Sequence, residues 1–293
     1  MKARAFEYTR AASLQDAFDA YARVSGDCCY LAGGQSLVPS LSLRLQAPNL
    51  LIDISGIEEM HGVGIVDGML RVGALTRHAE MLTSPEIARH APLLKLAAPH
   101  VAHPAIRNKG TIGGTIALAD PAAEFPAVVL ALDAELEIAG PTGRRRAKAE
   151  GFFKGLYETG LEPGEILTAV LVPPFRPDER CAFDELARRR GDYAIVGAAV
   201  QGRFQAEQVE ALSIAFLSVG PAPVRARNAE TAACGRPLSP AVIADAQAAL
   251  ELDLKPSDDA QTSGAMRLHL ARVLLGRLLG QLARAQRDEG DCQ

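Results

Sequence analysis

The chain has 293 residues, 48% of them hydrophobic and 23% charged, a composition typical of a folded globular protein rather than a disordered one. Its 31 basic and 35 acidic side chains give a formal net charge of −4, which argues against a general affinity for nucleic acid. No apolar run approaches the roughly 18 residues of a membrane-spanning helix, and no apolar segment follows the charged start. We therefore expect a cytoplasmic protein with no transmembrane segment and no nucleic-acid partner.

From the N-terminus, helical periods alternate with short apolar runs that are bounded by turn residues. The expected elements are, in chain order, a helix over residues 13–24 with Ser13 as N-cap, strands within 28–34 and 47–57, a hairpin over 61–76 that turns at Asp67-Gly68, and one helix over 84–101.

The middle of the chain reads as further sheet. Residues 126–140 and the segment after residue 149 indicate sheet elements around a basic, solvated turn at 144–146, with contact to a partner subunit as the alternative. Another apolar run, over 164–174, ends at Pro173 and Pro174, because proline removes a ladder donor. The polar stretch 176–180 follows, and we place a domain boundary there, which gives domains 1–176 and 177–293.

The C-terminal part combines strands and helices. Apolar runs within 183–204 and 210–220 are expected to pair as strands, and helices are expected over 239–252 and 264–284. The last helix carries a stripe that we expect to pack on the preceding sheet, because it lasts too few heptads for a coiled coil. The stripe consists of Met266, Leu270, Val273, Leu274, Leu278 and Leu282.

Two glycine pairs stand 80 positions apart and suggest an anion site. Glycine lets backbone N–H groups approach an anion closely, and hydroxyl or amide side chains flank both pairs. The segments are Leu31, Ala32, Gly33, Gly34, Gln35, Ser36 and Thr111, Ile112, Gly113, Gly114, Thr115. Neither matches a P-loop or a Rossmann fingerprint. From these residues alone, a diphosphate site and a pair of ordinary turns both remain open.

Other residues give no sign of a metal or of acid–base catalysis. The five cysteines are scattered and form no CxxC pair, which argues against a disulfide scaffold, a zinc site or an iron–sulfur cluster in this chain. His100 and His103 stand three apart, but no further ligand nearby completes a site. We expect no metal ligand and no catalytic acid or base.

Three longer stretches carry a family resemblance. Residues 32–57 (AGGQSLVPSLSLRLQAPNLLIDISGI) and 103–138 (HPAIRNKGTIGGTIALADPAAEFPAVVLALDAELEI) resemble the two flavin-binding signatures of the molybdenum hydroxylase flavoprotein subunits. Residues 187–200 (ARRRGDYAIVGAAV) resemble the start of their C-terminal domain. The match is to the medium subunit of the carbon monoxide dehydrogenase type, within the xanthine dehydrogenase family, and it covers nearly the whole chain in the expected order.

The resemblance implies an α+β fold. A PCMH/VAO-type FAD-binding domain, made of two α/β subdomains at about 1–57 and 58–176, would precede a C-terminal α+β domain with a three-stranded sheet plus helices. FAD would lie extended between these parts, with its pyrophosphate on the backbone of the two glycine segments.

The resemblance also implies contacts outside those segments. Glu124 would contact the ribityl or ribose region, the backbone at Ile166 and Leu167 would meet the flavin ring, and Tyr193 would lie near the isoalloxazine. Asp120 would either brace the second glycine segment or contact FAD directly. The chain departs from the family pattern at Leu118, where many relatives have histidine, and at Glu185, where some place a lysine; we assign neither a role.

The implied function is that of an electron-transfer subunit. FAD on this chain would take electrons from two [2Fe–2S] clusters of a small partner subunit and pass them to an external acceptor. A molybdopterin-containing large subunit would oxidise the substrate and complete a heterotrimer, which would itself dimerise; peripheral membrane association of the complex stays open. Two alternatives remain: a free-standing FAD-dependent oxidoreductase of the same fold, and a non-enzymatic nucleotide-binding adaptor.

Overall fold

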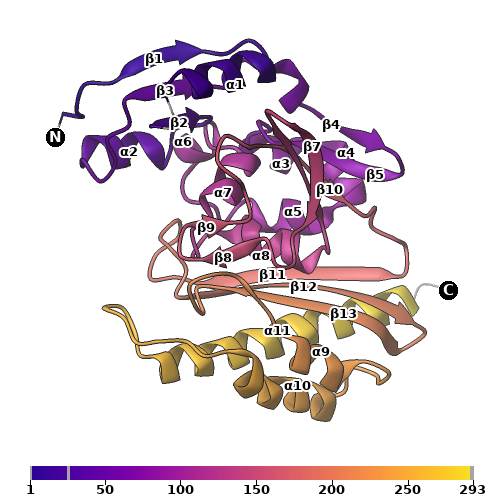
Figure 1. Cartoon of the computed structure of the whole chain (residues 1–293). Coiled ribbons are helices and arrows are strands. Elements are labelled where there is room, and N and C mark those ends of the chain that lie inside the picture. Colours follow the sequence, from indigo (N-terminus) through magenta and orange to yellow (C-terminus); the bar gives the residue numbers. More distant parts are fainter. Residues whose placement is uncertain (1, 25–26, 291–293) are drawn as a thin grey trace.

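The computed structural model describes residues 2–24 and 27–290, with side chains described to residue 284 (Figure 1). The first part is a small parallel sheet with strand order β1-β3-β2 and two helices. Its elements are β1 (Glu7–Arg10), α1 (Leu14–Arg23), β2 (Cys28–Leu31), α2 (Leu37–Ser42) and β3 (Leu50–Asp53). The predicted cap is confirmed: the Ser13 hydroxyl accepts the Asp16 N–H at 3.1 Å, and the Asp16 carboxylate accepts the Ser13 N–H at 3.1 Å.

A five-stranded antiparallel sheet follows, with strand order β4-β5-β10-β6-β7. Its strands are β4 (Val63–Val66), β5 (Met69–Gly73), β6 (Glu135–Gly140), β7 (Gly143–Lys148) and β10 (Ile166–Val172). The hairpin turn at Asp67-Gly68 is confirmed, and both residues have the positive φ, 51° and 75°, that a type I′ turn requires. β10 lies in the centre of the sheet and all of its residues are buried.

Helices fill the long connection between β5 and β6. They are α3 (His78–Thr83), α4 (Pro85–His90), α5 (Pro92–Ala97), α6 (Pro104–Arg107), α7 (Ile112–Leu118) and α8 (Glu124–Ala131); η1 (Glu58–Met60), β8 (Phe153–Gly155) and β9 (Glu158–Thr159) are short outlying elements. The prediction of one helix over 84–101 is wrong. Ala91 breaks it with φ −148° and ψ 59°, because the following Pro92 disfavours the helical region for its predecessor and starts a new helix.

The sheet prediction for residues 126–131 is also wrong, because they belong to helix α8. All eight residues of α8 are buried, so the sequence shows no amphipathic period that separates a buried helix from a buried strand.

The basic residues 144–146 lie in strand β7 and not in a turn. Their side chains pair with carboxylates of neighbouring strands and loops: Arg144 with Glu59, Arg145 with Glu165 at 2.5 Å, and Arg146 with Glu135 at 3.7 Å. Strand β7 therefore carries charged side chains along the edge of the sheet, which limit pairing of this edge with a strand of another molecule.

The C-terminal part is an antiparallel sheet covered by helices on both faces. Its elements are β11 (Glu179–Leu186), β12 (Val196–Gln205), β13 (Gln208–Leu217), β14 (Val224–Arg225), α9 (Arg227–Ala233), α10 (Pro240–Asp253) and α11 (Gly264–Gly290). The predicted strand pairing is confirmed, with two-residue β14 as a fourth strand beyond the three expected. In Figure 1, α5 and α8 lie on one face of this sheet and α9–α11 on the other.

The stripe on α11 packs on the sheet as predicted in its central and C-terminal turns. Leu274, Leu278 and Leu282 are fully buried in the C-terminal core, whereas Met266, in the first turn of the helix, is half exposed. The stripe thus packs against the C-terminal sheet from the second turn of the helix onward.

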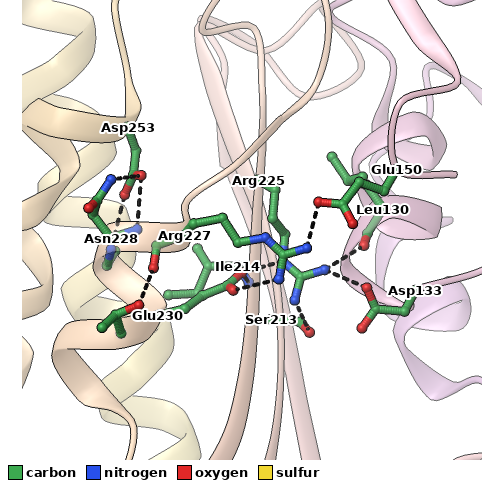
Figure 2. A network of polar contacts seen from close by, with 12 residues as sticks. Leu130, Asp133, Glu150, Ser213, Ile214, Arg225, Arg227, Asn228, Glu230 and Asp253 are labelled. Carbon is green, nitrogen blue, oxygen red and sulfur yellow. Dashed lines mark hydrogen bonds and ion pairs between the residues drawn. The ribbon is translucent and has the colours of Figure 1, made fainter.

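A polar network joins the C-terminal sheet to the end of α8 (Figure 2). The Arg225 side chain, only 7% exposed, donates to the Leu130 carbonyl at 3.2 Å, the Asp133 carboxylate at 2.6 Å and the Ser213 hydroxyl at 2.6 Å, and also pairs with buried Glu230. Glu230 additionally accepts the backbone N–H of Ile214 at 2.8 Å. One buried guanidinium therefore bonds groups on both sides of the junction between the two halves of the chain.

We predict that Arg225→Met lowers the free energy of unfolding by about 3–5 kcal/mol, because it leaves the buried Glu230 carboxylate with only the half-exposed Arg227 guanidinium, 3.4 Å away, as a cation. The matched control is Arg227→Met: Arg227 pairs with Glu150 in the same network, but its side chain is 51% exposed, so we expect a loss under about 1 kcal/mol. Urea unfolding followed by circular dichroism measures both. Equal losses for the two variants would contradict the prediction.

Candidate functional site

The structure brings the two glycine segments into direct contact. A Cβ atom on Gly33 would lie 2.2 Å from the carbonyl oxygen of Lys109 and 2.8 Å from the Cα atom of Gly110. A Cβ atom on Gly114 would lie 4.0 Å from the Cβ atom of Ala32. Segments 31–36 and 111–115, far apart in sequence, thus face each other at one place, as their predicted shared role requires.

The glycines serve different purposes. At Gly33 and Gly113 other parts of the protein take the space of the missing side chain; a Cβ on Gly113 would lie 2.4 Å from the Cβ atom and 2.7 Å from the carbonyl oxygen of Ala74. Gly34 has φ +72°, a conformation that glycine adopts without strain. Gly114 is exposed, and a Cβ there would lie 3.0 Å from the Thr111 hydroxyl oxygen and 4.0 Å from the Cβ atom of Ala32. Of these four glycines, only Gly114 would place a side chain between the two segments.

The first segment offers a row of backbone donors. In the part of the chain that the structure describes, the N–H groups of residues 32–36 donate to no protein acceptor. The Gln35 amide donates to the Gly33 carbonyl at 2.9 Å, which holds the turn, and the Ser36 hydroxyl makes no capping bond to the helix it precedes. Consecutive N–H groups in a turn form an anion-binding concavity, so these residues form a donor cradle (residues 32–36).

The second segment is the start of helix α7, and its N–H groups are already bonded. Ile112 donates to the Thr76 carbonyl at 3.1 Å and Gly113 to the Ala74 carbonyl at 2.8 Å. Gly114 donates to the Thr111 hydroxyl at 3.2 Å, and Thr115 to the Thr111 carbonyl at 3.1 Å. The expectation that an anion rests on the backbone N–H groups of 111–115 therefore has to be revised. For contact with an anion, this segment has threonine hydroxyl groups and the exposed surface at Gly114.

Buried carboxyl groups lie beside the segments. Glu124, the first residue of α8, is 9% exposed, and burial raises its pKa to about 8, with the charges of Glu185 and Asp120 adding to the effect. Glu185 projects from β11 with a side chain 5% exposed; its Oε1 lies 3.5 Å from the His100 Nδ1 atom, and its Oε2 has no hydrogen-bond partner among the described residues. Glu124 therefore retains its proton at neutral pH.

The other predicted residues lie around these carboxyls. The Asp120 carboxylate accepts the Ala122 N–H at 3.0 Å and so braces the turn that leads into α8. Partial burial of the Tyr193 hydroxyl and the neighbouring Asp120 charge raise the pKa of Tyr193, although its side chain is largely exposed. Ile166 and Leu167 are buried at the start of β10, which packs against α7.

Sequence reasoning missed two residues of this region. His78 is buried behind the second segment, and Tyr157 lies near Asp120, where it shares the electrostatic environment of Tyr193. Neither stands in a stretch of unusual composition. Only contacts between distant segments show that they belong here.

Comparison with known proteins identifies the family of the chain. The family described as the FAD-binding domain in molybdopterin dehydrogenase matches residues 4–175, and that of the CO dehydrogenase flavoprotein C-terminal domain matches residues 181–282. The α subunit of the 6-hydroxypseudooxynicotine dehydrogenase complex of Paenarthrobacter nicotinovorans is 37% identical over 96% of this chain and 95% of its own length. The carbon monoxide dehydrogenase medium chain of Hydrogenophaga pseudoflava is 34% identical over 94% and 96%.

A solved structure of carbon monoxide dehydrogenase from the same Hydrogenophaga species superposes with a TM-score of 0.94, at 35% identity, over 98% of this chain and 99% of that one. Fold and donor cradle thus define a flavoprotein of the expected α+β class. The chain belongs to the FAD-binding medium subunits of the molybdenum hydroxylases. It is an oxidoreductase subunit whose cofactor is FAD, and the row of donors at 32–36 fits a diphosphate.

None of the helices formed by residues 2–24 and 27–290 has the length and apolar character needed to cross a membrane.

We predict that unfolding of the full-length chain shows a pH dependence that Glu124 causes. Its pKa is raised in the folded state, from 4.5 to about 8, so the folded state holds the extra proton between these values. This stabilising contribution is complete below about pH 4.5 and is lost as the pH rises through 8. Glu124→Gln removes the loss, so the variant should exceed the wild type in urea midpoint at pH 8.5, and the advantage should shrink towards pH 5.

The control for this experiment is Glu207→Gln, an exposed glutamate in the turn between β12 and β13. It should follow the wild type at every pH. A Glu124→Gln profile parallel to the wild-type profile would refute the assignment.

Proposed function

We propose that this chain carries electrons between a partner subunit and an external acceptor. Two [2Fe–2S] clusters in a small subunit would deliver the electrons, after a molybdopterin-containing large subunit has oxidised the substrate. When bound, FAD supplies the two-electron redox chemistry, and the chain's own residues hold it and set its surroundings. The observation that carries the proposal is the donor cradle at 32–36, set against the second segment in a chain of this family.

The assignment of residues follows from the donor inventory. The diphosphate would take the N–H groups of Ala32, Gly33, Gly34, Gln35 and Ser36, and the second segment would close over it with Gly114 and the Thr115 hydroxyl. Leu31, Thr111, Ile112 and Gly113 would hold these two walls in place. All oxygen atoms of an ionised diphosphate accept hydrogen bonds. Each residue named here either donates a hydrogen bond or holds a donating residue in place.

The rest of the cofactor would lie towards the C-terminal part. Glu124, protonated at neutral pH, is suited to exchange hydrogen bonds with ribityl or ribose hydroxyls, since a neutral carboxyl both donates and accepts. The backbone at Ile166 and Leu167 would meet the flavin ring, with Tyr193 beside it. Asp120 would support this wall through its bond to Ala122 rather than bind FAD itself.

Assembly and location belong to the same proposal. The relatives compared above are named as a complex subunit and a medium chain, and we propose the same context for this protein: a cytoplasmic heterotrimer that dimerises. The division into domains 1–176 and 177–293, with subdomains at about 1–57 and 58–176, is supported by the change from the five-stranded sheet to the C-terminal sheet after β10.

The site is tested by Gly114→Val, which places a side chain in the gap between the segments. We expect FAD affinity to fall on the order of 100-fold, the effect of losing two charge-assisted hydrogen bonds of about 1.5–3 kcal/mol each in part or whole. Gly64→Val is the control: a Cβ there meets nothing within 4 Å, and Gly64 lies in hairpin strand β4. Titration by flavin fluorescence gives both affinities. Unchanged affinity in a folded Gly114→Val chain would remove the diphosphate from this gap.

The function is tested by comparing the chain alone with the chain co-expressed with its two partner subunits. Alone, it should hold FAD and accept electrons from dithionite, but no aldehyde, aromatic heterocycle or carbon monoxide should bleach the flavin. The trio should bleach with its own substrate. Bleaching of the lone chain at the rate of the trio would instead establish a free-standing oxidoreductase, and a chain without flavin would indicate an adaptor.

A further inference from the structure

A buried histidine stands directly behind the second glycine segment. His78, the first residue of α3, is 3% exposed, and its Nε2 atom lies 3.0 Å from the Thr115 hydroxyl oxygen. Its ring centroid is 5.2 Å from that of Phe125. The His78 backbone N–H donates to the Gly110 carbonyl at 3.0 Å, and a Cβ atom on Gly110 would come within 3.0 Å of the ring. The ring is therefore buried and packed between Phe125 and Gly110, with Nε2 beside Thr115.

Thr115 offers the less buried of the two hydroxyl donors of this segment. The N–H groups of residues 112–115 are all bonded within the protein. The Thr111 hydroxyl is buried and accepts the Gly114 N–H. Thr115 is half-buried, and in the part of the chain that the structure describes its hydroxyl contacts His78 and no other polar group. Whether this hydroxyl donates or accepts towards the gap depends on what His78 does.

The two forms of a neutral imidazole have opposite consequences here. If Nε2 carries the hydrogen, it donates to the Thr115 oxygen and leaves the hydroxyl hydrogen for a ligand. If Nδ1 carries it, Thr115 must donate to Nε2 and turns only lone pairs towards a diphosphate, which repels them. Nδ1 is buried with no hydrogen-bond partner, and a buried N–H without an acceptor is rarer than an unused lone pair.

The ring is neutral under ordinary conditions. Burial lowers the pKa of His78 to about 4; a hydrogen bond between the ring and the Thr111 backbone opposes this shift, and the Arg107 charge adds to it. A neutral imidazole ring carries a single N–H hydrogen, so that hydrogen lies either on Nδ1 or on Nε2 and the ring cannot donate from both.

We propose that His78 is a positioning residue of the cofactor site, which donates Nε2–H to the Thr115 hydroxyl and thereby directs the hydroxyl hydrogen towards the bound diphosphate. This rests on the proposed placement of the FAD diphosphate between the glycine segments. His78 itself does not touch the cofactor. Its hydrogen bond to Thr115 makes the hydroxyl a donor towards the cofactor. The backbone N–H groups of residues 112–115 cannot take this role, because they are already bonded within the protein.

The experiment is a set of FAD titrations on the full-length chain after removal of its flavin. Thr115→Val, which removes the hydroxyl, should weaken FAD binding about tenfold or more, and His78→Phe, which leaves the hydroxyl without the group that orients it, should weaken FAD binding by a smaller but measurable factor. The double variant should be no weaker than Thr115→Val, because both changes act through the same Thr115 hydroxyl. His78→Phe keeps a ring beside Phe125 and serves as its own packing control. His78→Gln and Thr115→Ser keep a donor and a hydroxyl, and should stay within about threefold of the wild type.

Two further readouts distinguish positioning from simple support of the fold. Riboflavin lacks the diphosphate, so its affinity should be the same in every variant. The ¹⁵N spectrum of labelled His78 should show the hydrogen on Nε2. A hydrogen on Nδ1, additive losses in the double variant, or an unaffected His78→Phe would each overturn the inference and leave the proposed function intact. A wild-type chain that binds no FAD would overturn the proposed function itself.

Discussion

Two contacts between backbones hold the candidate site together. Gly33 lies against Lys109, and Gly113 against Ala74, at distances that leave no room for a single methyl group. Gly33 follows a strand of the parallel sheet, whereas Ala74 follows β5 of the antiparallel sheet. The two contacts therefore tie both sheets to residues 109–113, with no side chain larger than the Ala74 methyl group between them. Because backbone contacts have no rotamers to adjust, the donor cradle keeps a fixed position relative to the segment that faces it.

Helix α8 connects this site to the C-terminal half. Its first residue is Glu124, and the carbonyl of Leu130 near its other end accepts a hydrogen bond from Arg225. A guanidinium at the C-terminal end of a helix matches the helix dipole. Every residue of α8 is buried, so the helix is a rigid spacer between Glu124 and the Arg225 network.

Local patterns in the sequence predicted much of this architecture. The Ser13 cap, the turn at Asp67-Gly68 and the end of β10 before Pro173 each depend on neighbouring residues, and all are present. The errors arose where the pattern was uniform or where one residue overrode it: α8 is apolar on all sides, and Pro92 interrupts an otherwise regular helical period.

The site itself was less accessible to such reasoning. The glycine pairs mark where the segments meet, but not that Gly33 and Gly113 accommodate protein backbone, nor that the N–H groups of α7 are already used. Those facts depend on Ala74, Thr76 and Lys109, which carry no signal of their own in the sequence. His78 and Tyr157 escaped notice for the same reason.

The charges of the buried groups explain how such a site can accept an anion with few cations at hand. Glu124 is protonated below about pH 8, and His78 is neutral above about pH 4. Between these values neither buried group carries a charge, so an ionised Glu124 does not oppose the diphosphate. Arg107, whose charge reaches both groups, donates to the carbonyls of Val101 and Ala102 at 2.7 and 2.9 Å and serves the fold. In the proposed placement, the attraction for the diphosphate would come from oriented N–H and O–H dipoles, which in a partly buried site are screened less than surface charges are.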